Sequence, residues 1–182
     1  MLQDLAFGRL DNQYQNHTPQ KGDIVVCIRG GSILIARDKQ DVLTLPSFEQ
    51  GDVWSEHWTH WHEQPYRYAF TMQDVRYFLW MGEAGDLADT YYAYEPAMSL
   101  RQRTSKNICF AMMTAWHLYN WYRSNLFCGK CGSKTAHDGK ERMMRCTECG
   151  NMIFPRINPA VIIGIISGDI TCSGPSRRRF EG

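Results

Sequence analysis

Four of the seven cysteines are arranged in two Cys-x-x-Cys pairs that could bind a metal ion. The first pair is Cys128 and Cys131, the second is Cys146 and Cys149, and fourteen residues separate the pairs. A Cys-x-x-Cys turn presents two sulfurs to one ion, and two such turns can complete a tetrahedron of thiolates around zinc. A redox dithiol or a pair of disulfides would also use paired cysteines, but neither explains the doubled pattern. We therefore predict a structural Zn²⁺ held by these four cysteines.

The segment around these cysteines predicts a zinc ribbon over residues 128–156. Gly132 and Gly150 directly follow the two pairs, and glycine suits a tight turn whose backbone passes close to a metal. Residues 142–145 and 151–154 are natural strands on either side of the second pair. Such a unit has almost no hydrophobic core. Zinc binding, worth on the order of 10 kcal/mol or more, would supply its stability.

The charges of this ribbon nearly cancel. Six basic residues outnumber three acidic ones, and a four-thiolate zinc site carries about −2, so the net charge falls to about +1. On charge alone the ribbon is a poor nucleic-acid clamp. The residues counted are Lys130, Lys134, Lys140, Arg142, Arg145 and Arg156 against Asp138, Glu141 and Glu148.

The composition of the whole chain predicts a folded, aromatic-rich protein. Hydrophobic residues make up 43% and aromatic residues 13% of the 182 residues, which argues against disorder. The formal net charge of +1 argues against a dedicated nucleic-acid or membrane-surface protein, since those usually carry a strong basic bias.

The other three cysteines indicate a reducing compartment. Cys27, Cys109 and Cys172 are single and share no spacing, unlike the disulfide framework of a small secreted protein. Residues 1–10 lack the apolar segment of a signal peptide. The longest apolar run, residues 160–166, is far too short to span a bilayer. We predict a cytoplasmic protein with no membrane contact.

Two β-hairpins are predicted within the first 95 residues. Residues 24–28 and 33–36 flank Gly30-Gly31, which supplies the positive φ values that a tight hairpin turn needs. Residues 66–70 and 75–80 are rich in β-branched and aromatic side chains, which favour strands. This part of the chain is therefore expected to form a small sheet-containing domain.

A tryptophan- and histidine-rich stretch lies between these hairpins. Trp54, Trp58 and Trp61 recur at i, i+4 and i+7, the spacing of one packed face of a short helix. Three histidines within residues 57–62 suggest a metal site, but no ligand set emerges from their spacing. The packed helix is the favoured interpretation, and no second metal is predicted.

A helix is predicted from Ser99 to Asn125. Ser99 with Gln102 could form a capping box at its start. The apolar stripe of this helix is expected to pack on the N-terminal sheet. The stripe follows the 3.6-residue period through Ile108, Ala111, Met112, Ala115, Leu118 or Tyr119, and Tyr122.

After the ribbon, residues 160–166 form a continuous apolar run that predicts a strand buried on both faces. Residues 167–169 are a predicted turn. No partner strand is predicted beyond it, because residues 170–182 lack alternation and contain a proline and three arginines. The expectation is that the chain is cut short or that its last dozen residues come from another reading frame.

Several of these segments together resemble the NADH pyrophosphatases of the Nudix superfamily. The resemblance lies in residues 122–127, the two cysteine pairs, and the run from Phe154 to Ile162 (FPRINPAVI). It implies enzymes that hydrolyse NADH or NAD⁺ to a nicotinamide mononucleotide and AMP with Mg²⁺ or Mn²⁺. It also implies a homodimer, and NAD-capped RNA as a further substrate of some members.

The resemblance implies an α+β fold class with four parts. These are an N-terminal domain of the NADH pyrophosphatase type (1–98), a connecting helix (99–127), a four-cysteine zinc ribbon (128–156), and the start of a truncated Nudix domain with an unstructured tail (157–182).

Three residues match positions that contact substrate in this family. Phe154 could stack on a nucleobase or nicotinamide ring, Glu141 matches a second contact, and Arg101 could pair with phosphate. The alternatives stay open: Phe154 could merely cap the ribbon, and Glu141 and Arg101 could be ordinary surface charges.

The chain departs from the family where catalysis should begin. A Nudix box is a Gly-x5-Glu-x7-Arg-Glu-x-x-Glu-Glu-type segment whose glutamates hold the catalytic metals. Past Asp169 the only carboxylate side chain is that of Glu181, so we name no catalytic residue and predict no activity alone. The rival hypotheses are a stand-alone zinc-ribbon module that binds protein or nucleic acid, and a regulator that pairs with a full-length enzyme.

Overall fold

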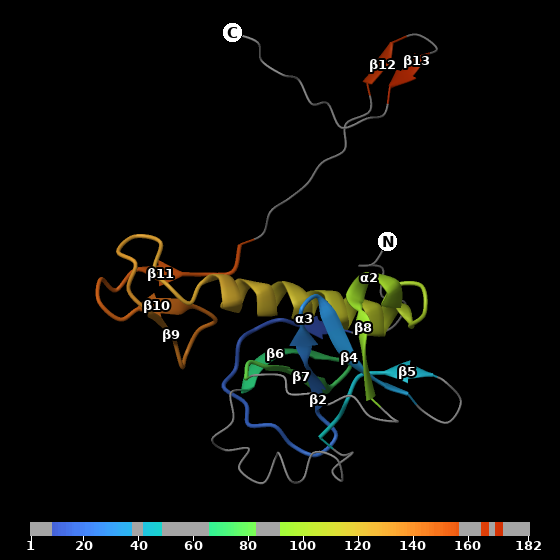
Figure 1. The fold of residues 1–182 in the computed structure, drawn as a ribbon, viewed down its shortest axis with the longest axis horizontal. Coiled ribbons are helices and arrows are strands. Elements are labelled where there is room, and N and C mark those ends of the chain that lie inside the picture. Colours follow the sequence, from blue (N-terminus) through green and yellow to red (C-terminus); the bar gives the residue numbers. More distant parts are fainter. Residues whose placement is uncertain are drawn as a thin grey trace.

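The computed structural model describes residues 9–37, 42–48, 66–82, 92–156, 165–167 and 170–172. The predicted tryptophan-rich helix lies outside these residues, as does most of the apolar run 160–166. Strands dominate the described part, with two helices, α2 and α3, lying beside them (Figure 1). The predicted α+β fold class is confirmed. No helix among the described residues is long and apolar enough to cross a membrane.

The first sheet has the strand order β1-β6-β7-β2. Its strands are β1 (Leu10–Asp11), β6 (Tyr66–Met72), β7 (Val75–Trp80) and β2 (Ile24–Val26). The predicted hairpin is the antiparallel pair β6–β7, whose turn at Gln73-Asp74 has φ values of 52° and 62°. The register of this pair shifts between Tyr68 and Phe70. Ala69 therefore sits at an irregularity, where a strand's backbone groups leave the regular ladder.

The second sheet is built on β4 (Ser32–Arg37). Strands β3 (Ile28–Arg29) and β5 (Leu43–Thr44) both pair with it, as does β8 (Tyr92–Pro96). The turn at Gly30-Gly31 has φ values of 52° and 91°, as predicted.

The predicted single strand over residues 24–28 is wrong, because this run divides between the two sheets. Its first part, β2, pairs in parallel with β7, and only β3 belongs to the hairpin. Cys27 lies at the change of partner, is fully buried, and accepts a hydrogen bond from the Leu34 amide at 2.9 Å. Alternation of side chains is the same on either side of Cys27, so the pattern could not reveal the change.

The predicted helix is also divided, into α2 (Ala97–Leu100) and α3 (Lys106–Ser124). The predicted capping box at Ser99 is wrong. The N-cap of α3 is Ser105, whose side chain accepts the Ile108 amide hydrogen at 3.3 Å, whereas the Ser99 hydroxyl donates to the Pro96 carbonyl. The apolar stripe begins at Ile108, three residues after Ser105. A cap at Ser105 therefore gives a hydrogen-bond acceptor to a backbone N–H group in the first turn of the helix, where the stripe begins.

The predicted stripe of α3 packs on the N-terminal strands, which it crosses in Figure 1. Ala111, Met112 and Ala115 are at most 1% exposed, and they belong to one core with Phe70 and Leu79. That core also contains Met144 of the ribbon, so helix, sheet and ribbon share buried side chains.

The prediction that no strand follows residues 167–169 is wrong. Strand β12 (Ile165–Ser167) pairs antiparallel with β13 (Ile170–Cys172), from Ile165 opposite Cys172 to Ser167 opposite Ile170. Ile170 and Thr171 are β-branched and favour extended backbone. A three-residue strand is too short for its alternation to be seen in the sequence.

Candidate metal centre

The ribbon sheet lies at the C-terminal end of α3 (Figure 1). It comprises β9 (Thr135–His137), β10 (Met144–Cys146) and β11 (Met152–Ile153) in the order β11-β10-β9, all antiparallel. The strands predicted over 142–145 and 151–154 correspond to β10, which starts later and extends to Cys146, and to β11, which is shorter at both ends. Strand β9 was not predicted, because its three residues carry no distinguishing pattern.

The two cysteine turns have the same backbone hydrogen bonds. In the first, the Cys128 amide donates to the Ser133 carbonyl at 2.7 Å and the Gly132 amide donates to the Cys128 carbonyl at 2.8 Å. In the second, the Cys146 amide donates to the Asn151 carbonyl at 2.9 Å and the Gly150 amide to the Cys146 carbonyl at 3.2 Å. Matching bonds make the two turns equivalent halves of one site.

Both turns end at a glycine with positive φ, as predicted. The φ angle is 77° at Gly132 and 68° at Gly150, values that residues with a Cβ adopt only at a cost. These glycines let the chain reverse while the sulfurs stay on one side.

The four sulfurs lie close together. Cys128 and Cys149 are 3.7 Å apart at Sγ, Cys131 and Cys146 are 3.4 Å apart, and Cys131 and Cys149 are 3.5 Å apart. All four Sγ atoms lie within 4.8 Å of one another. Four thiolates at about 2.3 Å from one zinc ion would lie roughly 3.8 Å apart. Disulfide bonds would require about 2.05 Å, so the thiols are free.

Hydrogen bonds to sulfur further suit a thiolate site. The Lys130 amide donates to Cys128 Sγ and the Cys149 amide to Cys146 Sγ, each at 3.4 Å. The Asn151 side-chain amide donates to Cys128 Sγ at 3.7 Å. Such donors spread the negative charge of the ligands and fix their orientation. The sequence motif did not reveal Asn151 as part of the site.

The lowered pKa of the Cys131 thiol also favours a role as a metal ligand. Hydrogen bonds with the backbone and side chain of Ser133, and then with Cys146 and Cys149, lower the pKa of the Cys131 thiol to about 6. The hydrogen bond with Cys131 contributes to raising the pKa of the Cys149 thiol to about 11. The thiolate is the form that binds zinc. The donor set and its spacing fit Zn²⁺, and the site is structural because all four positions of the tetrahedron are protein sulfurs.

One face of the ribbon sheet, which carries Met144 and Ile153, packs on the core formed by the N-terminal strands and α3. Met144 lies opposite His137 on one side and Ile153 on the other. Met144 is 5% exposed, and Ile153 packs against the same core.

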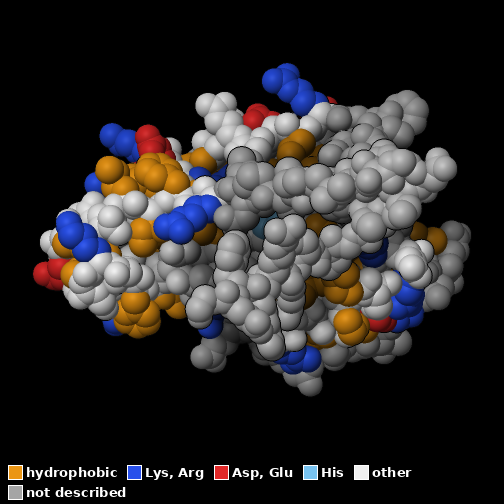
Figure 2. All heavy atoms as spheres, turned by 90° about the horizontal axis from the view of Figure 1, so that it is seen from above, with side chains coloured by type: hydrophobic (Ala, Val, Ile, Leu, Met, Phe, Trp, Pro, Cys, Tyr) orange, Lys and Arg blue, Asp and Glu red, His pale blue; other side chains and the backbone are white. Residues whose placement is uncertain are grey.

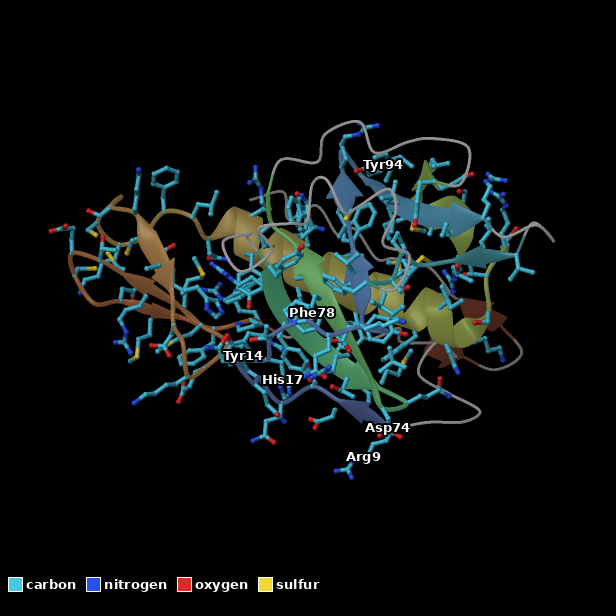
Figure 3. The ribbon with its side chains drawn as sticks, turned by 90° about the horizontal axis from the view of Figure 1, so that it is seen from below. Arg9, Tyr14, His17, Asp74, Phe78 and Tyr94 are labelled. Atoms are coloured by element: carbon cyan, nitrogen blue, oxygen red, sulfur yellow. The ribbon has the colours of Figure 1, made fainter. Side chains whose placement is uncertain are left out.

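Tyr14 lies between this face and the first sheet (Figure 3). The centroid of its ring is 5.3 Å from that of His137 and 6.4 Å from that of Tyr68. Burial, followed by the charge of Arg67, lowers the pKa of His137 to about 4, so its imidazole is neutral at pH 7. Burial raises the pKa of Tyr122 to about 12. The Tyr122 hydroxyl and His137 Nε2 are 3.1 Å apart, and this hydrogen bond joins α3 to the ribbon.

Two of the three predicted substrate contacts lie exposed on the ribbon. Phe154 follows β11 and is 47% exposed. Glu141 is exposed in the turn before β10. The Asp138 carboxylate orders this turn by accepting the Lys140 and Glu141 amides at 2.8 and 3.1 Å.

Arg101, the third predicted contact, lies at the other end of α3. It caps α2 and precedes the first residue of α3. The 19 residues of α3 span about 28 Å at 1.5 Å per residue. Within one chain, the structure does not bring Arg101 to the ribbon.

Comparison with known proteins supports the assignment of residues 128–149 to a zinc ribbon. Residues 123–154 match the family model described as the NADH pyrophosphatase zinc ribbon domain. The NAD-capped RNA hydrolase NudC of Pseudomonas aeruginosa (strain LESB58) is 41% identical over 62 residues, 34% of this chain and 22% of that protein. NudC of Deinococcus radiodurans is 39% identical over 54 residues, 30% of this chain and 19% of that protein. The match thus covers about a fifth of the length of these relatives.

Sheet, turns and sulfurs together define a four-cysteine zinc ribbon with a structural Zn²⁺ site. More narrowly, the ribbon is of the NADH pyrophosphatase type, so the predicted resemblance is confirmed for this part of the chain.

Proposed function

We propose that this chain contributes the N-terminal and zinc-ribbon portion of an NAD(H) pyrophosphatase. Such an enzyme hydrolyses the diphosphate of NADH or NAD⁺ to a nicotinamide mononucleotide and AMP, and NAD-capped RNA is a further proposed substrate. The observation that carries this proposal is the four-cysteine centre within a ribbon that matches the NADH pyrophosphatase family model over residues 123–154. The relatives named NAD-capped RNA hydrolase support it.

The ribbon would bind substrate through Phe154 and Glu141. A half-exposed phenylalanine ring offers a face on which a nicotinamide or adenine ring can stack. Glu141, in its ordered turn, can accept hydrogen bonds from substrate hydroxyl or amide groups. In the homodimer that we propose, Arg101 of a second copy would have to reach the phosphates, because α3 separates it from the ribbon of its own chain.

The chemical step would belong to a Nudix domain, which we propose begins within residues 157–182. It would follow the N-terminal domain (1–98), the connecting helix (99–127) and the zinc ribbon (128–156). Mg²⁺ or Mn²⁺ on its glutamates would polarise the phosphate. The 182 residues contain no such cluster of glutamates. We therefore expect this polypeptide alone to bind dinucleotide without hydrolysing it. Free thiols at Cys27 and Cys109 suit a reducing compartment, the cytoplasm.

Two measurements on the purified zinc-loaded chain test this proposal. Incubation with NADH and Mg²⁺ or Mn²⁺, followed by chromatography, should give no AMP above a protein-free control, and steady turnover would contradict the expected inactivity. A calorimetric titration with NADH should show saturable binding. The Phe154→Ala substitution should weaken the affinity for NADH about tenfold. The control Val42→Ala removes a side chain that is 50% exposed just before β5, and it should leave the affinity unchanged. A lack of NADH binding would contradict the proposed substrate contacts.

A further inference from the structure

The two cysteines of each Cys-x-x-Cys pair differ in exposure. Cys128 and Cys146, the first of each pair, are both 2% exposed. Cys131 and Cys149, the second of each pair, are both exposed. The metal centre therefore has a buried side and an open side, and a reagent dissolved in water reaches the sulfurs on the open side. Oxidation of cysteine depends on this access as well as on the thiolate form, which zinc ligands share.

The fold of the turns produces this difference in exposure. Cys146 is the last residue of β10 and shares the buried face of that strand with Met144, because residues two apart lie on one face. Cys149 lies three residues further on, in the turn itself. Cys128 and Cys131 hold the equivalent positions in the first turn, whose backbone hydrogen bonds match those of the second. The open side thus follows from the backbone and not from one side-chain rotamer.

The chain on either side of the two exposed cysteines is exposed as well. Their immediate neighbours, all exposed, are Lys130, Gly132, Glu148 and Gly150. The ribbon end of the molecule, at the left in Figure 2, presents hydrophobic and charged side chains to solvent. A small neutral oxidant such as hydrogen peroxide therefore approaches the open side of the centre directly.

The two exposed sulfurs are also neighbours. Cys131 Sγ and Cys149 Sγ lie 3.5 Å apart, although they are 18 positions apart in the chain and belong to different turns. A disulfide bond is about 2.05 Å long, so these sulfurs have to approach by only about 1.5 Å. A bond between them would link the two turns at the place where the zinc ion holds them together.

We propose that Cys131 and Cys149 are a site of reversible oxidation, at which a peroxide converts the two exposed zinc ligands into a disulfide and the ion is released. One exposed thiolate attacks a peroxide oxygen and becomes a sulfenic acid, and the other oxygen leaves as hydroxide. The second exposed thiolate attacks the sulfenic sulfur, forms the S–S bond and displaces a second hydroxide. The two sulfurs lose two electrons to the peroxide, and two protons from solvent convert the hydroxides into water.

The release of zinc follows from the loss of two of its four ligands. Cys128 and Cys146 remain as thiolates, each takes up a proton from solvent, and zinc departs without any change in its own oxidation state. The site needs neither a dinucleotide nor a Nudix domain, so its test is independent of the proposed function.

The oxidation is reversible because the ribbon has other attachments to the molecule. Met144 lies in the core with Phe70 of the first sheet, and the Tyr122 hydroxyl and His137 Nε2 are 3.1 Å apart. None of these contacts uses a cysteine of the centre. A thiol reductant therefore acts on a ribbon that is still in place. Disulfides in reducing compartments are usually transient and serve catalysis or redox sensing, which is the behaviour of this site.

The test treats the reduced, zinc-loaded chain with hydrogen peroxide in the presence of a chromogenic zinc chelator. Zinc should be released with peroxide and retained without it. After alkylation of the free thiols, peptide mass mapping should show Cys131 joined to Cys149, with Cys128 and Cys146 alkylated. Dithiothreitol followed by Zn²⁺ should restore the original zinc content.

Two histidine variants separate the exposed sulfurs from the buried ones. Cys149→His and Cys146→His each leave three cysteines and one imidazole, a ligand set that binds zinc. Cys149→His lacks one exposed sulfur and should retain its zinc over the time in which the wild type loses most of its own. Cys146→His keeps both exposed sulfurs and should lose zinc with the wild-type time course. Zinc content before peroxide shows whether each variant is loaded, and the peptide map of the wild type decides by itself if one is not.

Three results would overturn the proposal. The first is a wild-type chain that keeps its zinc in peroxide. The second is zinc release accompanied by a disulfide between any pair other than Cys131 and Cys149. The third is equal protection of zinc in Cys149→His and Cys146→His, because exposure would then not decide which sulfurs react.

Discussion

Arg142 of the ribbon donates a hydrogen bond from Nη2 to the backbone carbonyl of Ala69 in β6. Ala69 sits where the β6–β7 register shifts between Tyr68 and Phe70, so its carbonyl receives a partner from outside the sheet. The same guanidinium donates to Asn12 Oδ1. Arg142 thereby fixes the ribbon to the first sheet, and it follows directly after Glu141, the proposed substrate contact.

Replacing Arg142 with methionine should therefore loosen the ribbon. Arg142→Met keeps much of the apolar stem but leaves the buried Ala69 carbonyl without its donor. Hydrogen bonds from charged groups contribute about 1.5–3 kcal/mol, so we expect the free energy of unfolding to fall by about 2 kcal/mol in urea titrations. Arg123→Met, at an exposed position of α3, should change it by less than about 0.5 kcal/mol. Equal stability of the two variants would show that the Arg142 contact contributes nothing.

Asn151 should tune the zinc affinity without being a ligand. Asn151→Leu removes the side-chain donor to Cys128 Sγ, and loss of such outer contacts typically weakens metal binding about 10- to 100-fold. Competition with a chromogenic chelator measures this change. Asn120→Leu, on the exposed side of α3, should leave the zinc affinity at the wild-type value. If Asn151→Leu also retained that value, the sulfur contact would be incidental.

His137 should make the folded chain less stable in acid. Its pKa is lowered from 6.5 to about 4 in the fold, so the unfolded chain binds more protons between these two pH values. Stability from the neutral ring is fully present above about pH 6.5 and is lost as pH falls toward 4. The ring is only partly buried, so solvent screening limits the effect.

The contribution of His137 is measured as the difference between the wild type and His137→Gln. That difference cancels the protonation of the zinc ligands, which both proteins share. We expect the stability advantage of the wild type to shrink steadily from pH 6.5 to 4, and an NMR titration should place the imidazole pKa near 4. A pKa near 6.5, with a difference that does not depend on pH, would refute this assignment.

What the sequence could predict was local. The four ligands and the glycines that follow them form a short repeated pattern, and Gly30-Gly31 is a turn whose residue types match its positive φ values. By contrast, Arg142 contacts a carbonyl 73 residues away in the chain, and nothing near Arg142 in the sequence signals that partner.

The remaining mismatches have tertiary causes. The change of sheet at Cys27 depends on which strands are available as neighbours, and the alternation of side chains is indifferent to it. Ser99 and Ser105 are both acceptable caps, and the start of the buried stripe of α3 decides between them. Which residues share a face of the ribbon sheet depends on the register of three short strands, each too brief to show a pattern by itself.

The central claim is that Cys128, Cys131, Cys146 and Cys149 bind one zinc ion, and native mass spectrometry with elemental analysis tests it most directly. The wild-type chain should carry one Zn²⁺ after gel filtration. Cys131→Ser, which removes an exposed ligand, should lose that ion, whereas Cys109→Ala, which removes a buried thiol outside the site, should keep it. A folded wild-type chain without zinc, or a Cys131→Ser variant that retains zinc as the wild type does, would contradict the account.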